Sequence, residues 1–482
     1  MSLPFAVACG GSNTELPPPP SKMTPLPAPV AQAPAAPAKP AYPKFPKKAV
    51  TDSYGDTKVV DDFRALEDPK DPAVVAWSDA ENAFARKVLD GDPQRAAVAT
   101  RVGALMGESS PQWDGLVQKK GNIFALERHP PKQQPYLIVL STLDSIDKER
   151  VLVDPNAIDA SGGTSIGWFA PTPDGKKVAV ALAKGGAEHG DVHVFDVATG
   201  KEAKDVVDQA EGAGEGMCLA WKSDGSGFFY THAGREPNVP KDGVYQRIYF
   251  HKLGTPIEKD SLALGKDSPR IAQWELESSD DGKVTMARME YGDGDKWDQY
   301  ILTPKGWIEL ATKDDGVKTM KVGSAGELYL LSSKDAPRRK VLKTTVAAPS
   351  LEKAETVIEM GEHVIDAILP TKTRIYAIEG VGGPSRVVAY PLVKGKAGAA
   401  QPLATPDVSS VESLVSLGGD DIAFASESFT SPRAWFKVKG IDASVTKTAL
   451  ASTTKADFSN VEVSRDMCTS KDGIKVPMTI LK

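Results

Sequence analysis

The sequence predicts an all-β protein, a seven-bladed β-propeller that follows a short α-helical segment and a disordered, proline-rich N-terminus. Three observations support this: helical periodicity is confined to residues 61–106, β-rich runs fill the chain after Pro111, and one turn-and-strand pattern recurs seven times. We divide the chain into a signal-like start with a linker, a helical segment, the propeller and a short final segment, with boundaries 1–48, 49–110, 111–458 and 459–482.

The first residues resemble the end of a bacterial lipoprotein signal. An apolar run over residues 3–8 ends at Cys9, and a Gly/Ser/Pro stretch follows. The run lacks a preceding basic region and is shorter than the roughly 7–15 residues of a usual signal. Cys9 is therefore a candidate for lipidation, which would place the protein in the bacterial cell envelope or periplasm. An unmodified tail and a cytoplasmic location are the alternative.

The linker that follows is rich in proline. Residues 16–48 contain twelve of the 37 prolines, mixed with alanine and lysine. Such a composition buries too little apolar surface to offset the entropy of ordering. We expect an extended spacer of about 3.1 Å per residue wherever it adopts the polyproline II conformation.

Two helices are predicted next. Asp71 followed by Pro72 is typical of a helix N-cap with proline in the first turn. Apolar residues then recur at spacings of three and four, as in an amphipathic helix: Val74, Val75, Trp77, Ala80, Phe84, Val88 and Leu89. A second helix is expected over residues 95–106.

The propeller prediction depends on the repeated pattern, a polar turn followed by a short strand of aromatic and branched residues. Its seven copies are separated by 44 to 57 residues and are marked by Gly121, Gly175, Gly225, Gly282, Gly326, Thr373 and Asp420. Repeats of this length with several strands each are typical of propellers, in which neighbouring sheets stack around an axis. A helical solenoid would need long helical runs, and a β-sandwich of this length would be unusual.

Several motifs resemble those of one peptidase family. They occupy residues 54–68, with Ala65 where the family usually has tryptophan, and residues 77–82, 153–156, 246–255, 428–432 and 469–478. In these segments, which occur in order between about residues 42 and 482, the chain resembles the prolyl oligopeptidase family of serine peptidases.

The resemblance implies a seven-bladed propeller inserted into an α/β-hydrolase that cleaves short peptides after proline with a Ser-Asp-His triad. It implies that residues 49–110 pack on the hydrolase and that residues 459–482 are the first strands of a truncated hydrolase domain. We expect no catalytic residue in this chain and no activity for the chain alone. The resemblance implies short proline-containing peptides as partners, and a separately encoded hydrolase domain is a further candidate partner. No cofactor is implied, and substrate-binding residues stay unassigned.

Other candidate sites in the sequence are weak. Ser165 lies in a literal Gly-x-Ser-x-Gly match at residues 163–167, but loop precedes it and a strand pattern follows, whereas a nucleophile elbow needs a strand before it and a helix after it. His189 and His193 lack the glutamate of a zinc-peptidase helix. The acidic residues 291–298 lack the spacing of a calcium-binding loop. We therefore predict no metal site.

Charge and cysteine content narrow the remaining functions. The net charge of −6 gives no basic field, so nucleic acid is not an expected partner. No apolar run approaches eighteen residues, so membrane contact is expected only through a lipid anchor. Cys218 is expected to be a buried apolar residue and Cys468 to lie in a strand, with no disulfide framework. The alternative function is a stand-alone, envelope-tethered propeller that binds peptides or a protein partner.

Overall fold

The computed structural model describes residues 41–482 except 108–109, 211–217, 237–238, 240–243 and 293. Cys9 and most of the predicted linker lie outside the described residues, so lipidation at Cys9 stays a prediction. The described chain divides into two compact units, Met1–Met106 and Gly107–Lys482, which are taken separately below.

The first unit contains a β-hairpin and two helices. The hairpin pairs β1 (Val50–Tyr54) with β2 (Thr57–Asp61), and η1 (Arg64–Glu67), α1 (Pro72–Asp90) and α2 (Arg95–Gly107) follow. The predicted N-cap is confirmed, because the Asp71 carboxylate accepts a hydrogen bond from the Ala73 amide at 2.8 Å. The hairpin lies in the segment that we predicted as helical. No described helix is long and apolar enough to cross a membrane.

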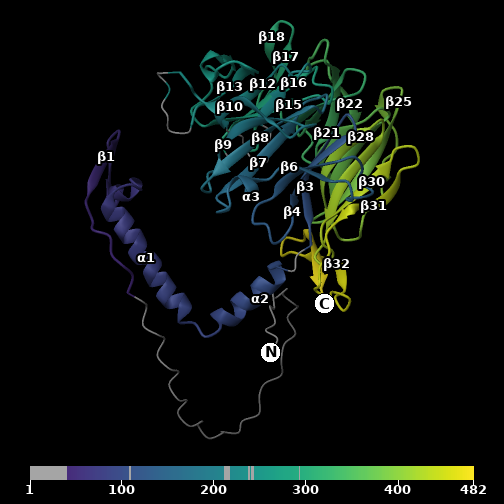
Figure 1. Ribbon diagram of the computed structural model, residues 1–482. Coiled ribbons are helices and arrows are strands. Elements are labelled where there is room, and N and C mark those ends of the chain that lie inside the picture. The colour runs from purple at the N-terminus through teal and green to yellow at the C-terminus, as the bar shows by residue number, and fades with distance from the viewer. Residues whose placement is uncertain (1–40, 108–109, 211–217, 237–238, 240–243, 293) are drawn as a thin grey trace, which may run out of the picture. The chain divides into compact units, whose positions relative to one another are not determined.

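The second unit is a propeller of seven antiparallel sheets, each formed by strands that are consecutive in the sequence (Figure 1). Blade 1 contains β3 (Gln112–Lys119), β4 (Asn122–Arg128), β5 (Tyr136–Leu140) and β6 (Arg150–Val153). After α3 (Pro155–Ile158), blade 2 contains β7 (Thr164–Pro171), β8 (Lys177–Lys184), β9 (Gly190–Asp196) and β10 (Glu202–Ala210). Blade 3 contains β11 (Leu219–Trp221), β12 (Gly227–Ala233), β13 (Gln246–Lys252), η2 (Ile257–Lys259) and β14 (Ser261–Leu264).

The remaining four blades follow the same order. Blade 4 contains β15 (Ala272–Ser278), β16 (Thr285–Tyr291), β17 (Trp297–Thr303) and β18 (Gly306–Ala311). Blade 5 contains β19 (Val317–Val322), β20 (Glu327–Ser332), β21 (Lys340–Thr345) and β22 (Glu355–Ile358). Blade 6 contains β23 (Val364–Pro370), β24 (Arg374–Gly380), β25 (Ser385–Val393), β26 (Lys396–Ala397) and β27 (Gln401–Pro402). Blade 7 contains β28 (Ser410–Gly418), β29 (Asp421–Glu427), β30 (Ala434–Lys439) and β31 (Ser444–Ala451).

All seven marks predicted from the sequence fall in the turn between the first and second strands of a blade, which confirms the propeller prediction. The recurring Asp-Gly pair has a local cause. Asp174 accepts a hydrogen bond from the amide two residues later, at 3.1 Å, and Gly175 adopts a φ of +68° that favours glycine. We call the face of the ring that carries these turns the turn face. The opposite face, at which each first strand begins, is the leading face.

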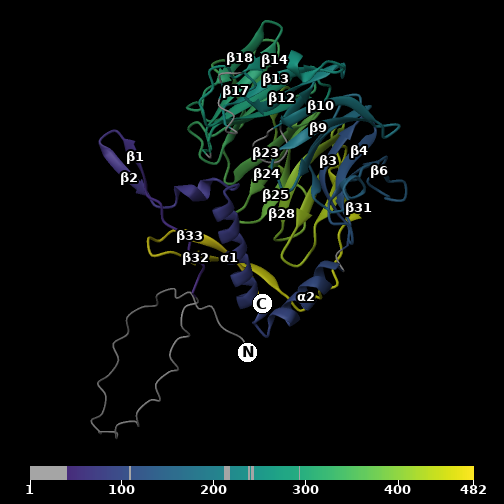
Figure 2. The ribbon, with the colours of Figure 1, turned by 60° about the vertical axis from the view of Figure 1, so that its left-hand side comes forward.

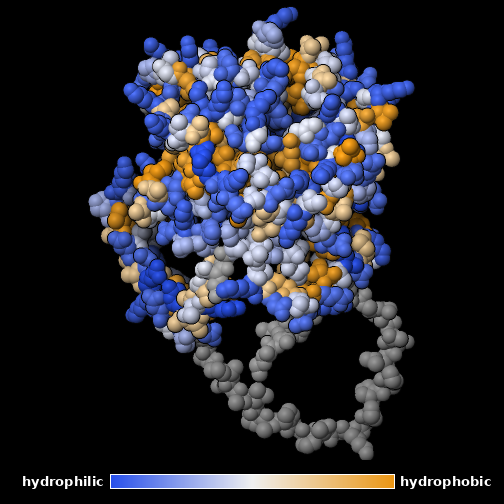
Figure 3. All heavy atoms as spheres, turned by 45° about the vertical axis from the view of Figure 1, so that its right-hand side comes forward, coloured by the Kyte–Doolittle hydropathy of each residue, from blue (hydrophilic) through white to orange (hydrophobic). Residues whose placement is uncertain are grey.

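The core is a ring of seven apolar clusters, one at each boundary between adjacent blades. Both faces of each sheet are therefore covered by neighbouring sheets, which explains the continuous burial along second strands such as β8. Hydrophilic side chains dominate the surface seen in Figure 3, with apolar residues in small separate patches.

Blade 7 meets blade 1 without sharing a strand. In Figure 2, β3, β4 and β6 lie beside β31, and an apolar cluster fills this boundary. The Trp435 indole donates to the Trp113 carbonyl at 2.8 Å, and the Ser452 hydroxyl donates to the Pro111 carbonyl at 2.8 Å. Side-chain packing and hydrogen bonds therefore close the ring.

A final hairpin follows blade 7, formed by β32 (Val463–Thr469) and β33 (Lys475–Leu481). The Arg465 guanidinium donates to the carbonyls of Val381 and Gly382 in blade 6, at 2.9 and 2.7 Å. Val476 and Met478 on β33 are exposed. The expected strand pair in residues 459–482 is present, whereas its place in a hydrolase domain stays a prediction.

Candidate functional site

Ser165 does not lie on a nucleophile elbow. It is inside strand β7 and pairs with Ala183 of β8, and the strand continues on both sides of it. An elbow would place the serine on a sharp turn between a strand and a helix. The literal motif match therefore lacks the required geometry, and the absence of a catalytic residue from this chain stays a prediction.

The candidate histidines and acidic residues also belong to the blades. His193 lies on β9 and its Nδ1 is 2.7 Å from Glu202 of β10, while His189 lies in the preceding loop. Asp298 is buried and accepts a hydrogen bond from the Tyr291 hydroxyl at 2.6 Å. In the described part of the chain, no group of three His, Cys, Asp or Glu side chains is arranged to hold a metal ion.

Neither of the two described cysteines, Cys218 and Cys468, forms a disulfide. Cys218 is fully buried, as expected, and burial raises the pKa of its thiol. Cys468 lies on β32 and pairs with Val476 across the final hairpin. Cys218 therefore lacks the lowered pKa and exposed setting of a reactive cysteine.

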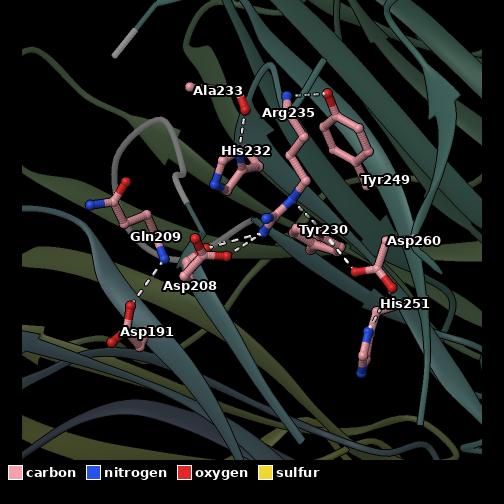
Figure 4. A network of polar contacts seen from close by, with 10 residues as sticks. All are labelled: Asp191, Asp208, Gln209, Tyr230, His232, Ala233, Arg235, Tyr249, His251 and Asp260. Carbon is pink, nitrogen blue, oxygen red and sulfur yellow. Dashed lines mark hydrogen bonds and ion pairs between the residues drawn. The ribbon is translucent and has the colours of Figure 1, made fainter. Parts of the chain in front are cut away.

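A buried polar network joins blades 2 and 3 (Figure 4). Tyr230 and His232 project from the same face of β12 because they are two residues apart. The Tyr230 hydroxyl donates to Asp260 at 2.9 Å, and Asp260 also accepts from Nδ1 of His251 at 2.8 Å. His251 and Asp260 are almost completely buried, so this charge pair is shielded from water.

Arg235 links this pair to blade 2. Its Nε donates to the Tyr230 hydroxyl at 2.9 Å, and its guanidinium forms an ion pair of 2.6 Å with Asp208 at the end of β10. The Tyr249 hydroxyl accepts from the Arg235 amide and donates to Glu236, both at 2.9 Å. Burial, followed by the neighbouring Glu236, raises the pKa of Tyr249 to about 12 and keeps this phenol protonated.

The pKa values of the two histidines in the network are shifted in opposite directions. Burial and then the positive charge of Arg235 lower the pKa of His232, which favours its neutral form. For His251, burial opposes the charged form, but the hydrogen bonds and charges of Asp260 and Asp205 outweigh this and raise the pKa. The network therefore fixes blade 3 against blade 2 and extends from Arg235, beyond the end of β12, to His251, which pairs with Phe228 at the start of β12. Sequence reasoning missed it, and its only signal was polar residues at inward-facing positions of β12 and β13.

The turn face carries a contact across the ring. Lys119, the last residue of β3 before the marked turn of blade 1, forms an ion pair of 3.0 Å with Asp280 in the marked turn of blade 4. A Cβ built on Gly282 would lie 2.4 Å from Pro173 of blade 2 and 2.9 Å from Ser223 of blade 3. Because blades 1 and 4 are not neighbours, these turns span the axis of the propeller and narrow its opening on this face.

Comparison with known proteins agrees with this architecture. Residues 43–448 match the family model described as the prolyl oligopeptidase N-terminal β-propeller domain. The match covers most of the chain, and the chain belongs to this family.

Relatives and solved structures agree with the assignment. The chain is 27% identical to a prolyl endopeptidase of Elizabethkingia meningoseptica over 65% of this chain and 44% of the relative. It is 24% identical to prolyl oligopeptidase A of Galerina marginata, over 89% of this chain and 62% of the relative. The chain therefore spans less than two thirds of the length of these relatives.

Among solved structures, one from a study of two prolyl endopeptidases superimposes with a TM-score of 0.78 at 26% identity, over 92% of this chain and 64% of the other. Prolyl oligopeptidase B of Galerina marginata superimposes with a TM-score of 0.75 at 18% identity, over 92% of this chain and 65% of the other, and shows a common fold.

Proposed function

We propose that this chain is the substrate-gating propeller portion of a prolyl-oligopeptidase-type serine peptidase that cleaves short peptides after proline. The observation that carries the proposal is the family match over residues 43–448. The contact between Lys119 and Asp280 across the ring supports a gating role, because it restricts passage through the turn face.

We further propose that a hydrolase portion completes the enzyme, with a separately encoded hydrolase chain as one source of it. The helices α1 and α2 bury no residue, and Val88, Leu89, Val98 and Met106 are exposed. Apolar residues of β33 are exposed as well, and such surfaces mark interaction sites. These exposed segments, 49–110 and 459–482, are where we place the contacts with the hydrolase.

Two measurements test the proposal. The purified chain should not hydrolyse a chromogenic Gly-Pro substrate, and turnover that copurifies with the chain would refute the predicted lack of a nucleophile. The DNA beyond codon 482 should contain an open reading frame that encodes a Gly-x-Ser-x-Gly nucleophile elbow. Coexpression of the protein encoded by that reading frame with this chain should restore proline-specific turnover.

The alternative is a stand-alone propeller that binds peptides or a protein partner without cleaving them. A monodisperse chain that binds a proline peptide, with no hydrolase frame at the locus, would favour that alternative over the peptidase.

A further inference from the structure

A cavity of about 650 Å³ lies between blades 3 and 4. It is bounded by β14 and the turn that follows it, residues 265–269, and by strands β15 to β18. In Figure 1 blade 4 is at the top of the propeller, beside β12 and β13 of blade 3. Its size falls within the range of about 300–1,000 Å³ that is usual for ligand pockets. It is separate from the polar network between blades 2 and 3.

Three aromatic residues, Trp274, Tyr291 and Tyr300, line this cavity. Trp274 is 1% exposed and its ring centre lies 5.2 Å from that of Tyr300. Tyr291 stands at the end of β16, and Met289 and Leu264 complete the apolar lining. Trp274 is therefore covered, and the partly buried Tyr291 and Tyr300 are the rings that can face a ligand.

The hydrogen-bond donors of these rings are already used within the protein. The Trp274 indole donates to Ser268 at 3.1 Å, and the Tyr291 hydroxyl donates to Asp298 at 2.6 Å. The Tyr300 hydroxyl donates to Glu309 at 3.4 Å. A neutral polyproline segment needs donors for its carbonyl groups, so these rings are poorly suited to bind one.

The charges around the cavity favour a cation. Exposed Asp267 and Glu309 stand at the rim, and the buried Asp298 adds a third carboxylate. Burial and then Asp298 raise the pKa of Tyr291 to about 12, and burial, Glu309 and Asp298 raise that of Tyr300. These shifts agree with a negative potential along the wall.

Two lysines lie close to the same carboxylates. Lys266 lines the rim, and the ammonium group of Lys313 lies 4.9 Å from the centre of the Tyr291 ring. Lys313 leaves the Tyr300 ring available, and its position shows that an aromatic face of this wall accepts an ammonium group. Ring faces next to carboxylates attract lysine and arginine side chains.

We propose that this cavity binds a lysine or arginine side chain of a peptide, at a distance from the cleaved bond. The proposal rests on the proposed function in one respect, that the ligand is a peptide. The carboxylates of Asp267 and Glu309 receive the charged head, and the partly buried Tyr300 ring packs against its stem.

The test uses the purified full chain and two octapeptides that each contain one proline. The two peptides differ at one position, which is lysine in the first and norleucine in the second. Norleucine keeps the apolar stem and removes the charge. Isothermal titration calorimetry at 150 mM salt should give a dissociation constant at least about fivefold lower for the lysine peptide. Glu309→Gln and Tyr300→Leu should abolish this preference, whereas Glu258→Gln, at an exposed glutamate of η2, should preserve it.

Equal affinities of the native chain for the two peptides would overturn the proposal, as would a preference that survives in Glu309→Gln. Because Glu309 is exposed, that variant tests the site without disturbing the core, and thermal unfolding checks the fold of Tyr300→Leu. The two proposals fail separately. Restored turnover without a lysine preference refutes only the cation site, and a lysine preference without restored turnover refutes only the peptidase.

Discussion

His251 lies between carboxylates from two different blades. Its Nδ1 is 2.8 Å from Asp260 of blade 3, and its Nε2 is 3.4 Å from Asp205 of blade 2. The raised pKa means that the folded protein binds a proton more tightly than the unfolded chain does. This contribution to stability is complete below the unfolded value of about 6.5 and is lost as the pH rises through the folded value.

The first prediction concerns the pH dependence of this contribution. His251→Asn keeps a donor near Asp260 but cannot carry a charge. We expect the difference in free energy of unfolding between the native chain and His251→Asn to shrink as the pH rises above about 6.5. Urea unfolding between pH 6 and 9 measures this difference. In Asp205→Asn, which removes one carboxylate, the same pH dependence should be weaker. A difference that stays constant with pH would contradict the prediction.

Individual buried residues were only partly predictable. The burial of Cys218 followed from its apolar neighbours, and Ser165 could be placed in a strand from the pattern after it. The partners of His251 could not be predicted, because nothing in the sequence indicates that Asp205 of one blade faces Asp260 of the next. Strand alternation shows which residues share a face, whereas ion pairs between blades depend on how the sheets stack.

At the scale of elements, the turns between the first and second strands of the blades were the features best predicted from the sequence. An aspartate that caps its own turn and a glycine with positive φ can be recognised from a few residues, so the marked turns were placed correctly. The β1–β2 hairpin over residues 50–61 was missed because its Tyr-Gly-Asp turn stands alone, next to a strong helical pattern. Its strands are short and mostly exposed, so the sequence lacks the alternation of apolar and polar residues that would predict a half-buried strand.

The final hairpin gives a prediction at this scale. Arg465 donates to two carbonyls of blade 6, and a Cβ on Gly382 would lie 2.7 Å from Pro477. We expect Arg465→Gln to weaken the attachment by about 1 to 2 kcal/mol, since hydrogen bonds from charged groups are stronger than neutral ones. We expect Gly382→Ala to weaken it too. Hydrogen exchange of the hairpin amides should accelerate in both variants, with little change in propeller unfolding.

Gly383→Ala is the matched control for backbone strain. Gly383 also has a positive φ, of +117°, but a Cβ there would meet nothing within 4 Å. This variant therefore strains the same loop without touching the hairpin, and hairpin exchange should stay near the native rate. If Gly383→Ala accelerates hairpin exchange as much as Gly382→Ala does, loop strain and not contact with Pro477 explains the effect.

At the scale of the whole molecule, the propeller is a ring with one boundary unlike the others. The chain itself connects each blade to the next, except where blade 7 returns to blade 1. The seven repeats predicted the ring and its order, because evenly spaced sheets that cannot bury their faces alone must stack. They could not predict how the ring closes, since Trp113 and Trp435 belong to different repeats and meet only in the closed structure.

The last prediction compares two buried tryptophans that each donate a hydrogen bond across a boundary, one from the third strand of blade 7 and one from the first strand of blade 3. The Trp435 indole donates to a blade 1 carbonyl at 2.8 Å, and the Trp221 indole donates to the Ala170 carbonyl of blade 2 at 2.8 Å. Each alanine substitution should cost about 3–5 kcal/mol of unfolding free energy. Only Trp435→Ala should also open the boundary locally, because no chain connection holds blade 7 to blade 1. Hydrogen exchange under native conditions should then accelerate in β3 and β30 for Trp435→Ala, while Trp221→Ala shows no comparable local opening in β7 and β11. Equal local opening at both boundaries would mean that packing alone, and not chain connection, sets the stability of every boundary in the ring.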